Sequence, residues 1–209
     1  MPPRGRRDGT CVLKRPDLEQ LADEAVKELV ASGAFSTYSG RLPPRAGEKL
    51  RRSKLRLDDE SLFEDIFSER MIALTRNAYV EEVGDEDLDE KVLALSYDRP
   101  VMADIYSNYC RPCNHILPIV YQLAERYRDE LKVVKINVST NARFRELFLG
   151  PVQMTPAFLF FKDGRPVRAS GRRLARLLGQ TAFITSTRAG LEKRIRSVLG
   201  MSTHSHGWD

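Results

Sequence analysis

The sequence predicts an α/β fold: a mixed β-sheet flanked by helices and preceded by an N-terminal helical extension. From about residue 77 onward, short apolar runs typical of buried strands alternate with segments of helical periodicity. Before residue 77, apolar residues recur only at helical spacing, in two stretches separated by a segment rich in proline, glycine and charge. A strand followed by a cysteine pair and then a helix lies at the centre of the second region.

The chain has 209 residues, of which 42% are hydrophobic and 30% charged, a composition typical of globular proteins. We expect a tail over residues 1–15, a helical extension with a linker over 16–76, a folded domain over 77–200 and a second tail over 201–209. No apolar run reaches the roughly 18 residues that span a bilayer, and the basic start lacks the apolar core of a secretory signal. Three cysteines are too few for a secreted disulfide scaffold, so we expect a reducing compartment, the cytoplasm first and an organelle second.

Charge is spread unevenly over a chain whose net charge is +5. Residues 51–56 are basic, residues 58–90 are strongly acidic, and a second basic cluster covers residues 165–176. Solvated surface is the preferred interpretation, and docking onto an acidic protein is the alternative. No nucleic-acid-binding motif accompanies the charges, so the sequence does not favour a nucleic-acid partner.

Two amphipathic helices are predicted in the extension. The first begins at Pro16, since proline suits a first helical turn, and ends at Gly33. The second covers about 59–75, with Ser61 and Glu64 at capping-box spacing. Residues 34–57 between them are predicted to be a linker with little packing of its own. The apolar face of each helix needs a cover, which is the following domain in the preferred interpretation and a protein partner in the alternative.

The folded domain is predicted element by element from its periodicity and turn residues. The Asp163-Gly164 pair predicts a hairpin between the last two strands. The expected elements are a strand at 78–83, a helix from 85, a strand at 101–106, helix 113–128, strand 131–138, a short helix at 141–149, strands 157–161 and 166–170, and helix 188–199. This order predicts a mixed sheet with helices on both faces.

The strongest functional signal is Cys110-Arg111-Pro112-Cys113, at the turn between a predicted strand and helix. Two cysteines at this spacing can close a disulfide, bind a metal or exchange disulfides with another protein. A zinc site is not favoured, because there is no second CxxC. The helix N-terminus and the Arg111 cation would both stabilise a Cys110 thiolate. Asp104 is costly to bury within an apolar strand, which favours a functional role.

The segment 109–120, YCRPCNHILPIV, resembles WCGPCKMIAPIL of the thioredoxin family. Asp104 stands where that family places a buried aspartate, and Lys135 stands where it places a lysine near that aspartate. Thr155-Pro156 resembles its cis-proline turn, and residues 162–164 resemble its K-N-G turn. The resemblance covers about residues 77–199 and implies a thioredoxin-like fold.

The resemblance also implies roles for the site residues. Cys110 would be the nucleophile and Cys113 the resolving cysteine, with Asp104 accepting the proton of Cys113 and Lys135 tuning Asp104. The implied substrate-binding residues are Tyr109, Arg111, Pro112, Thr155 and Pro156. The implied function is a thiol–disulfide oxidoreductase that reduces or exchanges protein disulfides, with a thioredoxin-reductase-like electron donor and neither cofactor nor metal.

A non-catalytic alternative stays open at this point. Tyr109 and Arg111 replace the family's tryptophan and glycine, and residues 1–76 have no counterpart in a minimal thioredoxin. The preceding helical region is similar in architecture to phosducin-like proteins. In the alternative interpretation the domain is a binding or assembly factor that docks on a protein partner through its N-terminal helices.

Overall fold

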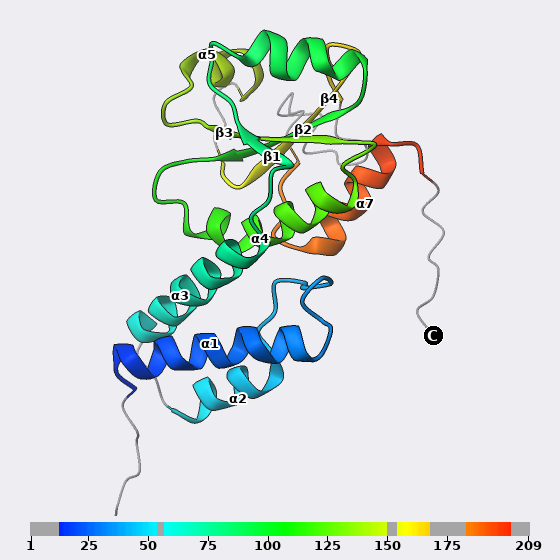
Figure 1. Cartoon of the computed structure of the whole chain (residues 1–209). Coiled ribbons are helices and arrows are strands. Elements are labelled where there is room, and N and C mark those ends of the chain that lie inside the picture. The colour runs from blue at the N-terminus through cyan, green and yellow to red at the C-terminus, as the bar shows by residue number, and fades with distance from the viewer. Residues whose placement is uncertain (1–12, 54–56, 150–153, 168–182, 202–209) are drawn as a thin grey trace, which may run out of the picture.

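The computed structural model describes residues 13–53, 57–149, 154–167 and 183–201 (Figure 1). Residues 168–182, which hold much of the second basic cluster and most of the predicted strand at 166–170, lie outside this description. The elements are α1 (Arg15–Ala31), α2 (Pro44–Arg52), α3 (Leu57–Thr75), β1 (Val80–Glu82), η1 (Asp89–Ala94), η2 (Leu95–Tyr97), β2 (Val101–Tyr106), α4 (Arg111–Arg126), β3 (Lys132–Asn137), α5 (Ala142–Phe144), η3 (Arg145–Leu149), β4 (Ala157–Lys162), β5 (Arg165–Pro166) and α7 (Arg188–Val198).

The five described strands form one mixed sheet, as the sequence predicted, and their order in the sheet is β1-β3-β2-β4-β5. β1 and β2 both run parallel to β3, whereas β4 is antiparallel to β2 and β5 is antiparallel to β4. β2 is therefore central and buried on both faces, which explains why its sequence is almost continuously apolar.

Each face of the sheet has its own hydrophobic core. Because side chains alternate along a strand, Val101, Ala103 and Ile105 of β2 pack toward η1, α5 and η3. Met102 points to the opposite face, where it packs with residues of α1, α3, α4 and α7. Asp104, two residues further along β2, shares the face of Met102 and so lies on the side of the sheet that α4 covers.

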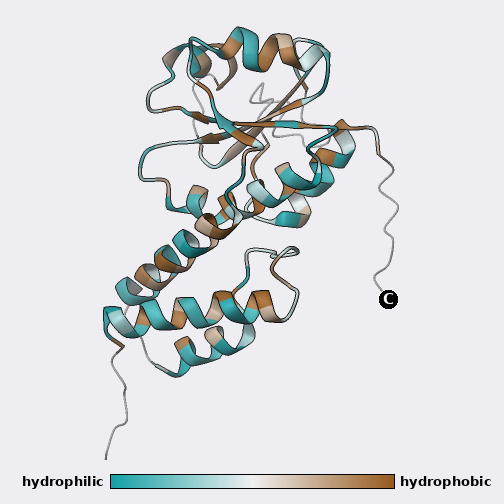
Figure 2. Cartoon of the chain, in the orientation of Figure 1, coloured by the Kyte–Doolittle hydropathy of each residue, from teal (hydrophilic) through white to brown (hydrophobic). Residues whose placement is uncertain are grey.

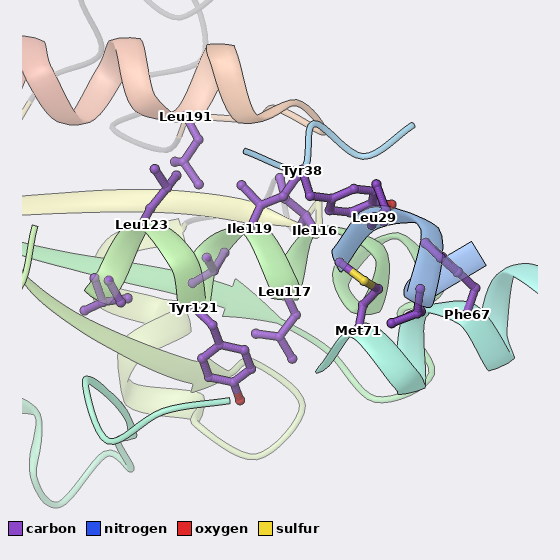
Figure 3. Packing of buried hydrophobic residues seen from close by; sticks show 14 of the residues in the cluster. Leu29, Tyr38, Phe67, Met71, Ile116, Leu117, Ile119, Tyr121, Leu123 and Leu191 are labelled. Atoms are coloured by element: carbon purple, nitrogen blue, oxygen red, sulfur yellow. The ribbon is translucent and has the colours of Figure 1, made fainter. Parts of the chain in front are cut away.

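The extension packs directly on the domain. Figure 2 shows hydrophobic residues in the strands and interspersed with hydrophilic ones along α1 and α3, as in amphipathic helices. Phe67 and Met71 of α3 belong to the same buried cluster as Ile116 and Ile119 of α4 (Figure 3). The apolar faces of α1 and α3 are therefore covered within the chain, in agreement with the preferred interpretation.

Helix α4 is enclosed over more than one complete turn. Residues 116–121 are six consecutive buried positions, although a helical turn takes only 3.6 residues. A helix that packs on one side only would show exposed positions within such a stretch. The first turn of α4, by contrast, carries the exposed residues Arg111, Pro112 and Asn114.

The prediction that residues 34–57 pack little was wrong. This stretch contains α2, whose Ala46 and Leu50 are buried, and it contributes the buried Tyr38, whose ring meets Phe67 edge-on. The nine-residue α2 has only two buried apolar positions, and a pattern this short cannot be recognised as helical periodicity in the sequence. The proline pair at its start, which suggested a break, instead precedes and begins the helix.

Two helix predictions need smaller corrections. α3 begins by Leu57, so Ser61 and Glu64 lie inside the helix and do not cap it. The helix expected from Asp85 forms as the π-helical segment η1 followed by the 3₁₀ segment η2. Apolar spacing over so few residues does not distinguish these windings from an α-helix.

Arg188 joins the extension to the domain. Its guanidinium donates to the carbonyl of Ser36 at 2.6 Å and to Oε1 of Gln122 at 3.0 Å, and Gln122 donates to the carbonyl of Phe35 at 2.7 Å. The loop after α1 is thus hydrogen-bonded to α4 and α7 through a nearly buried cation.

We expect Arg188→Met to lower the free energy of unfolding by about 1–3 kcal/mol, because it leaves polar groups without partners in a partly buried place. Urea unfolding followed by circular dichroism measures this. Lys193→Met removes an exposed cation from the same helix and should change stability by less than about 0.5 kcal/mol. Equal effects of the two substitutions would contradict the bridging role of Arg188.

Candidate active site

The two cysteines lie at the beginning of α4 and form a disulfide. Cys110 is the N-cap residue, and its Sγ accepts a hydrogen bond from the backbone N–H of Cys113 at 3.3 Å. The sulfurs are 2.04 Å apart. Cys110 is half-buried and Cys113 is 6% exposed, so a substrate can reach Cys110 far more easily. Pro112 occupies the first helical turn, where its missing N–H removes no helical hydrogen bond.

The loop before the cysteines presents Tyr109 to solvent. Tyr109 has a φ of 64°, in the left-handed region that residues other than glycine rarely adopt, and its side chain is fully exposed. The loop is held by its neighbour Asn108, whose backbone N–H donates to Ser139 Oγ and whose Oδ1 accepts from Asn137, at 3.0 and 2.9 Å. The ring therefore stands beside Cys110 as a contact surface.

A second loop completes the mouth of the site. The peptide bond between Thr155 and Pro156 is cis, as expected, and Pro156 is buried. The hydroxyl of Thr155 lies 3.0 Å from the hydroxyl of Ser107, three residues before Cys110. This hydrogen bond ties the turn before β4 to the turn after β2. Met154, which the sequence interpretation did not count among the substrate-binding residues, is 59% exposed at this turn.

Asp104 is a buried carboxyl group on the sheet face beneath α4. It is 2% exposed, and its Oδ1 has no hydrogen-bond partner among the described residues. Burial raises the pKa of Asp104 to about 7, while the positive charge of Lys135, directly opposite on β3, acts in the other direction. A carboxyl group in this state can both take up and release a proton near neutral pH.

Lys135 also contacts an aromatic ring. Its Nζ lies 4.5 Å from the ring centroid of Tyr106, whose hydroxyl donates to Glu82 at 2.5 Å. Burial, followed by the hydrogen bond to Glu82, raises the pKa of Tyr106, so this phenol stays neutral. The structure thus places the half-buried Lys135 opposite Asp104, on the same face of the sheet.

Arg111 is paired with a residue that the sequence interpretation missed. Its Nη2 lies 2.8 Å from Oδ2 of Asp65 on α3, and Nε2 of His115 lies 3.9 Å from the other carboxylate oxygen. The expected cation beside Cys110 is therefore partly compensated. The acidic stretch of α3 was visible in the sequence, but which of its carboxylates meets α4 depends on helix packing.

Within residues 13–53, 57–149, 154–167 and 183–201, no three His, Cys, Asp or Glu side chains are grouped to hold a metal ion. No helix in this same part of the chain combines the length and apolarity needed to cross a membrane.

Comparison with known proteins agrees with this geometry. The family model described as Thioredoxin matches residues 79–181. A thioredoxin of Alicyclobacillus acidocaldarius is 33% identical over 75 residues, which are 36% of this chain and 70% of that protein. Thioredoxin Y1 of Arabidopsis thaliana, described as chloroplastic, is 33% identical over 74 residues, and the chain spans only 42% of its length.

Among solved structures, a thioredoxin of Malassezia sympodialis has a TM-score of 0.45 and 18% identity, over 57% of this chain and 90% of that one. The CxxC pair at the start of α4, the buried Asp104 and the cis-proline turn all lie within the residues that the family model matches. This chain belongs to the thioredoxin family.

Proposed function

We propose that this chain reduces or exchanges protein disulfides through Cys110 and Cys113. Membership of the thioredoxin family supports a thiol–disulfide oxidoreductase. The observation that carries the proposal is the unequal burial of two disulfide-bonded cysteines at a helix N-terminus, of which Cys110 is half-buried and Cys113 is buried. A positive helix end favours the thiolate, which is the attacking species.

In the reduced protein the Cys110 thiolate attacks one sulfur of the substrate disulfide. A bond between Cys110 and that sulfur forms, the substrate S–S bond breaks, and the leaving thiolate takes a proton from solvent. Cys113 then gives its proton to Asp104, directly or through water, and attacks Cys110 Sγ. The bond between Cys110 and the substrate sulfur breaks, and the second substrate thiolate leaves and takes up a proton from Asp104 or solvent. Two electrons have then passed to the substrate, and the Cys110–Cys113 disulfide remains.

A donor of the thioredoxin-reductase type would return two electrons to the disulfide and close the cycle. A reducing compartment, the cytoplasm or an organelle, suits such a donor. Lys135 would lower the cost of ionising Asp104 and so adjust the pH at which the second step is fast.

The mouth of the site would bind an extended peptide. Tyr109, Arg111 and Pro112 would contact it on one side of the sulfurs, and Thr155 and Pro156 on the other. A substrate strand could pair with the backbone next to Pro156 while its side chains meet the exposed ring of Tyr109.

Reduction of insulin by dithiothreitol tests the proposal. The wild-type chain should accelerate precipitation of the insulin B chain several-fold over dithiothreitol alone, and Cys110→Ser should be no faster than dithiothreitol. Cys11→Ser, the same substitution outside the CxxC, should retain the wild-type rate. The proposal fails if the wild type is no faster than Cys110→Ser.

The alternative of a non-catalytic binding factor loses its main support, because the apolar faces of α1 and α3 are occupied within the chain. Cys113→Ser tests it directly. This variant should retain substrates as mixed disulfides on Cys110 that dithiothreitol releases, whereas Cys110→Ser/Cys113→Ser should retain none. Recovery of the same proteins with the double variant would favour the binding factor.

A further inference from the structure

Asp65 reaches the active-site helix from outside the segment that matches the thioredoxin family model. It lies on α3, whereas that model begins at residue 79. The two side chains are only partly exposed, Arg111 at 48% and Asp65 at 35%. The position of Asp65 relative to α4 is held by packing. Ile66 and Phe67, which follow Asp65 on α3, are buried in the same cluster as Ile116 of α4.

Arg111 is the charged residue closest in sequence to Cys110. An unpaired cation there would stabilise the Cys110 thiolate and thus the reduced state, which makes a disulfide more oxidising. The Asp65 carboxylate, 2.8 Å from the guanidinium, offsets part of the electrostatic potential that the Arg111 cation would create at Cys110 Sγ. Nε2 of His115 lies further from the Asp65 carboxylate, at 3.9 Å, and Asp104 faces α4 from the sheet below.

We propose that Asp65 is a positioning residue for the Cys110–Cys113 couple, which holds Arg111, offsets its charge, and thereby makes the couple more reducing. The N-terminal extension would then act on the redox chemistry through one ion pair besides covering α4. This inference rests on the proposed function, since it presumes that the cysteine pair cycles between its two oxidation states.

The test is the equilibrium of the full chain with reduced and oxidised glutathione, read by alkylating free thiols. We expect Asp65→Asn to shift the equilibrium constant about two- to three-fold toward the reduced protein, the size expected for a partly exposed ion pair. The midpoint of the pH profile for Cys110 alkylation should fall by about 0.4 pH units, which corresponds to that fold-change. Asp65→Glu keeps the charge and should restore much of the wild-type value.

Glu69→Gln provides the matched control, because it removes the same charge from an exposed position one turn further along α3. It should leave both readouts at the wild-type value. Arg111→Ala should shift the equilibrium in the direction opposite to Asp65→Asn, because it removes the part of the guanidinium charge that Asp65 does not offset.

The double variant Asp65→Asn/Arg111→Ala decides whether the effect passes through Arg111. The shift caused by Asp65→Asn should shrink to within error in the Arg111→Ala background. An undiminished shift there, or no shift in Asp65→Asn alone, would overturn the proposal. Because glutathione replaces the protein substrate, these results do not depend on insulin reduction, and failure of either proposal can be recognised separately.

Discussion

Asp104→Asn should stabilise the oxidised protein at pH 8 by as much as about 4 kcal/mol. The pKa of Asp104 is about 7 in the folded protein, chiefly because of burial, against 3.8 for a free aspartate. Each unit of difference corresponds to about 1.4 kcal/mol, so the folded protein bears the cost of an ionised, buried carboxylate at alkaline pH. An uncharged amide of nearly the same shape removes that cost and leaves only its own imperfect hydrogen bonding.

The direction of the pH dependence follows from the same difference. The folded protein holds the Asp104 proton more tightly than the unfolded chain does, so stability falls as pH rises from about 4 to about 7. Below this window the carboxyl group is protonated in both states, and above it the penalty is constant. Urea unfolding of the oxidised wild type and of Asp104→Asn at pH 5 and pH 8 should give a difference that grows with pH.

Asp98→Asn, an exposed position, should show no such growth and should change stability by less than about 0.5 kcal/mol. A pH-independent difference between the wild type and Asp104→Asn would contradict titration of Asp104 in this window. Asp104→Asn should also reduce insulin at least about 10-fold more slowly, because it removes the proposed proton acceptor of Cys113. If Asp104→Asn were both more stable and less active than the wild type, Asp104 would be a functional group that lowers the stability of the folded protein.

Phe63→Ala should have the largest effect on stability of any substitution in the extension. Phe63 is fully buried on α3 and stacks against Phe67, with ring centroids 6.0 Å apart. Removing it leaves a cavity in the hydrophobic cluster that the extension and the domain share, at a cost of about 3–5 kcal/mol. We expect one cooperative transition in urea, shifted to lower denaturant, because both regions share one hydrophobic cluster.

Leu74→Ala is the matched control on the same helix. Leu74 is 59% exposed, and its loss should cost less than about 0.5 kcal/mol. Two separate transitions in Phe63→Ala, one for the extension and one for the sheet, would show that the helices fold independently of the domain. A small effect of Phe63→Ala would show that α3 does not depend on this contact.

The sheet could be predicted closely from the sequence because its strands carry strong local signals. β2 is a buried apolar run, the turn after β4 contains Asp-Gly, and the alternation of strands and helices defines the order of elements. The cysteines, Asp104 and Pro156 could be predicted as a group because the resemblance spaces them along one segment.

The remaining features depend on tertiary contacts that no local pattern records. The pairing of Asp65 with Arg111 joins residues 46 positions apart, and it is set by how α3 lies on α4. The hydrogen bond from Arg188 to the carbonyl of Ser36 joins residues 152 positions apart. The left-handed backbone of Tyr109 is likewise imposed by neighbouring loops, since tyrosine itself does not favour it.

The complete enclosure of the middle of α4 limits how another protein can approach the sulfurs. Near the sulfurs, the exposed residues that the structure describes belong to the first turn of this helix and to the two adjoining loops, so an incoming chain would meet a narrow rim and not a broad helical face. Contacts of small area give short-lived complexes. A partner recognised in this way would need a projecting, extended segment that brings its disulfide to the rim, and buried disulfides of rigid proteins would be spared until they unfold.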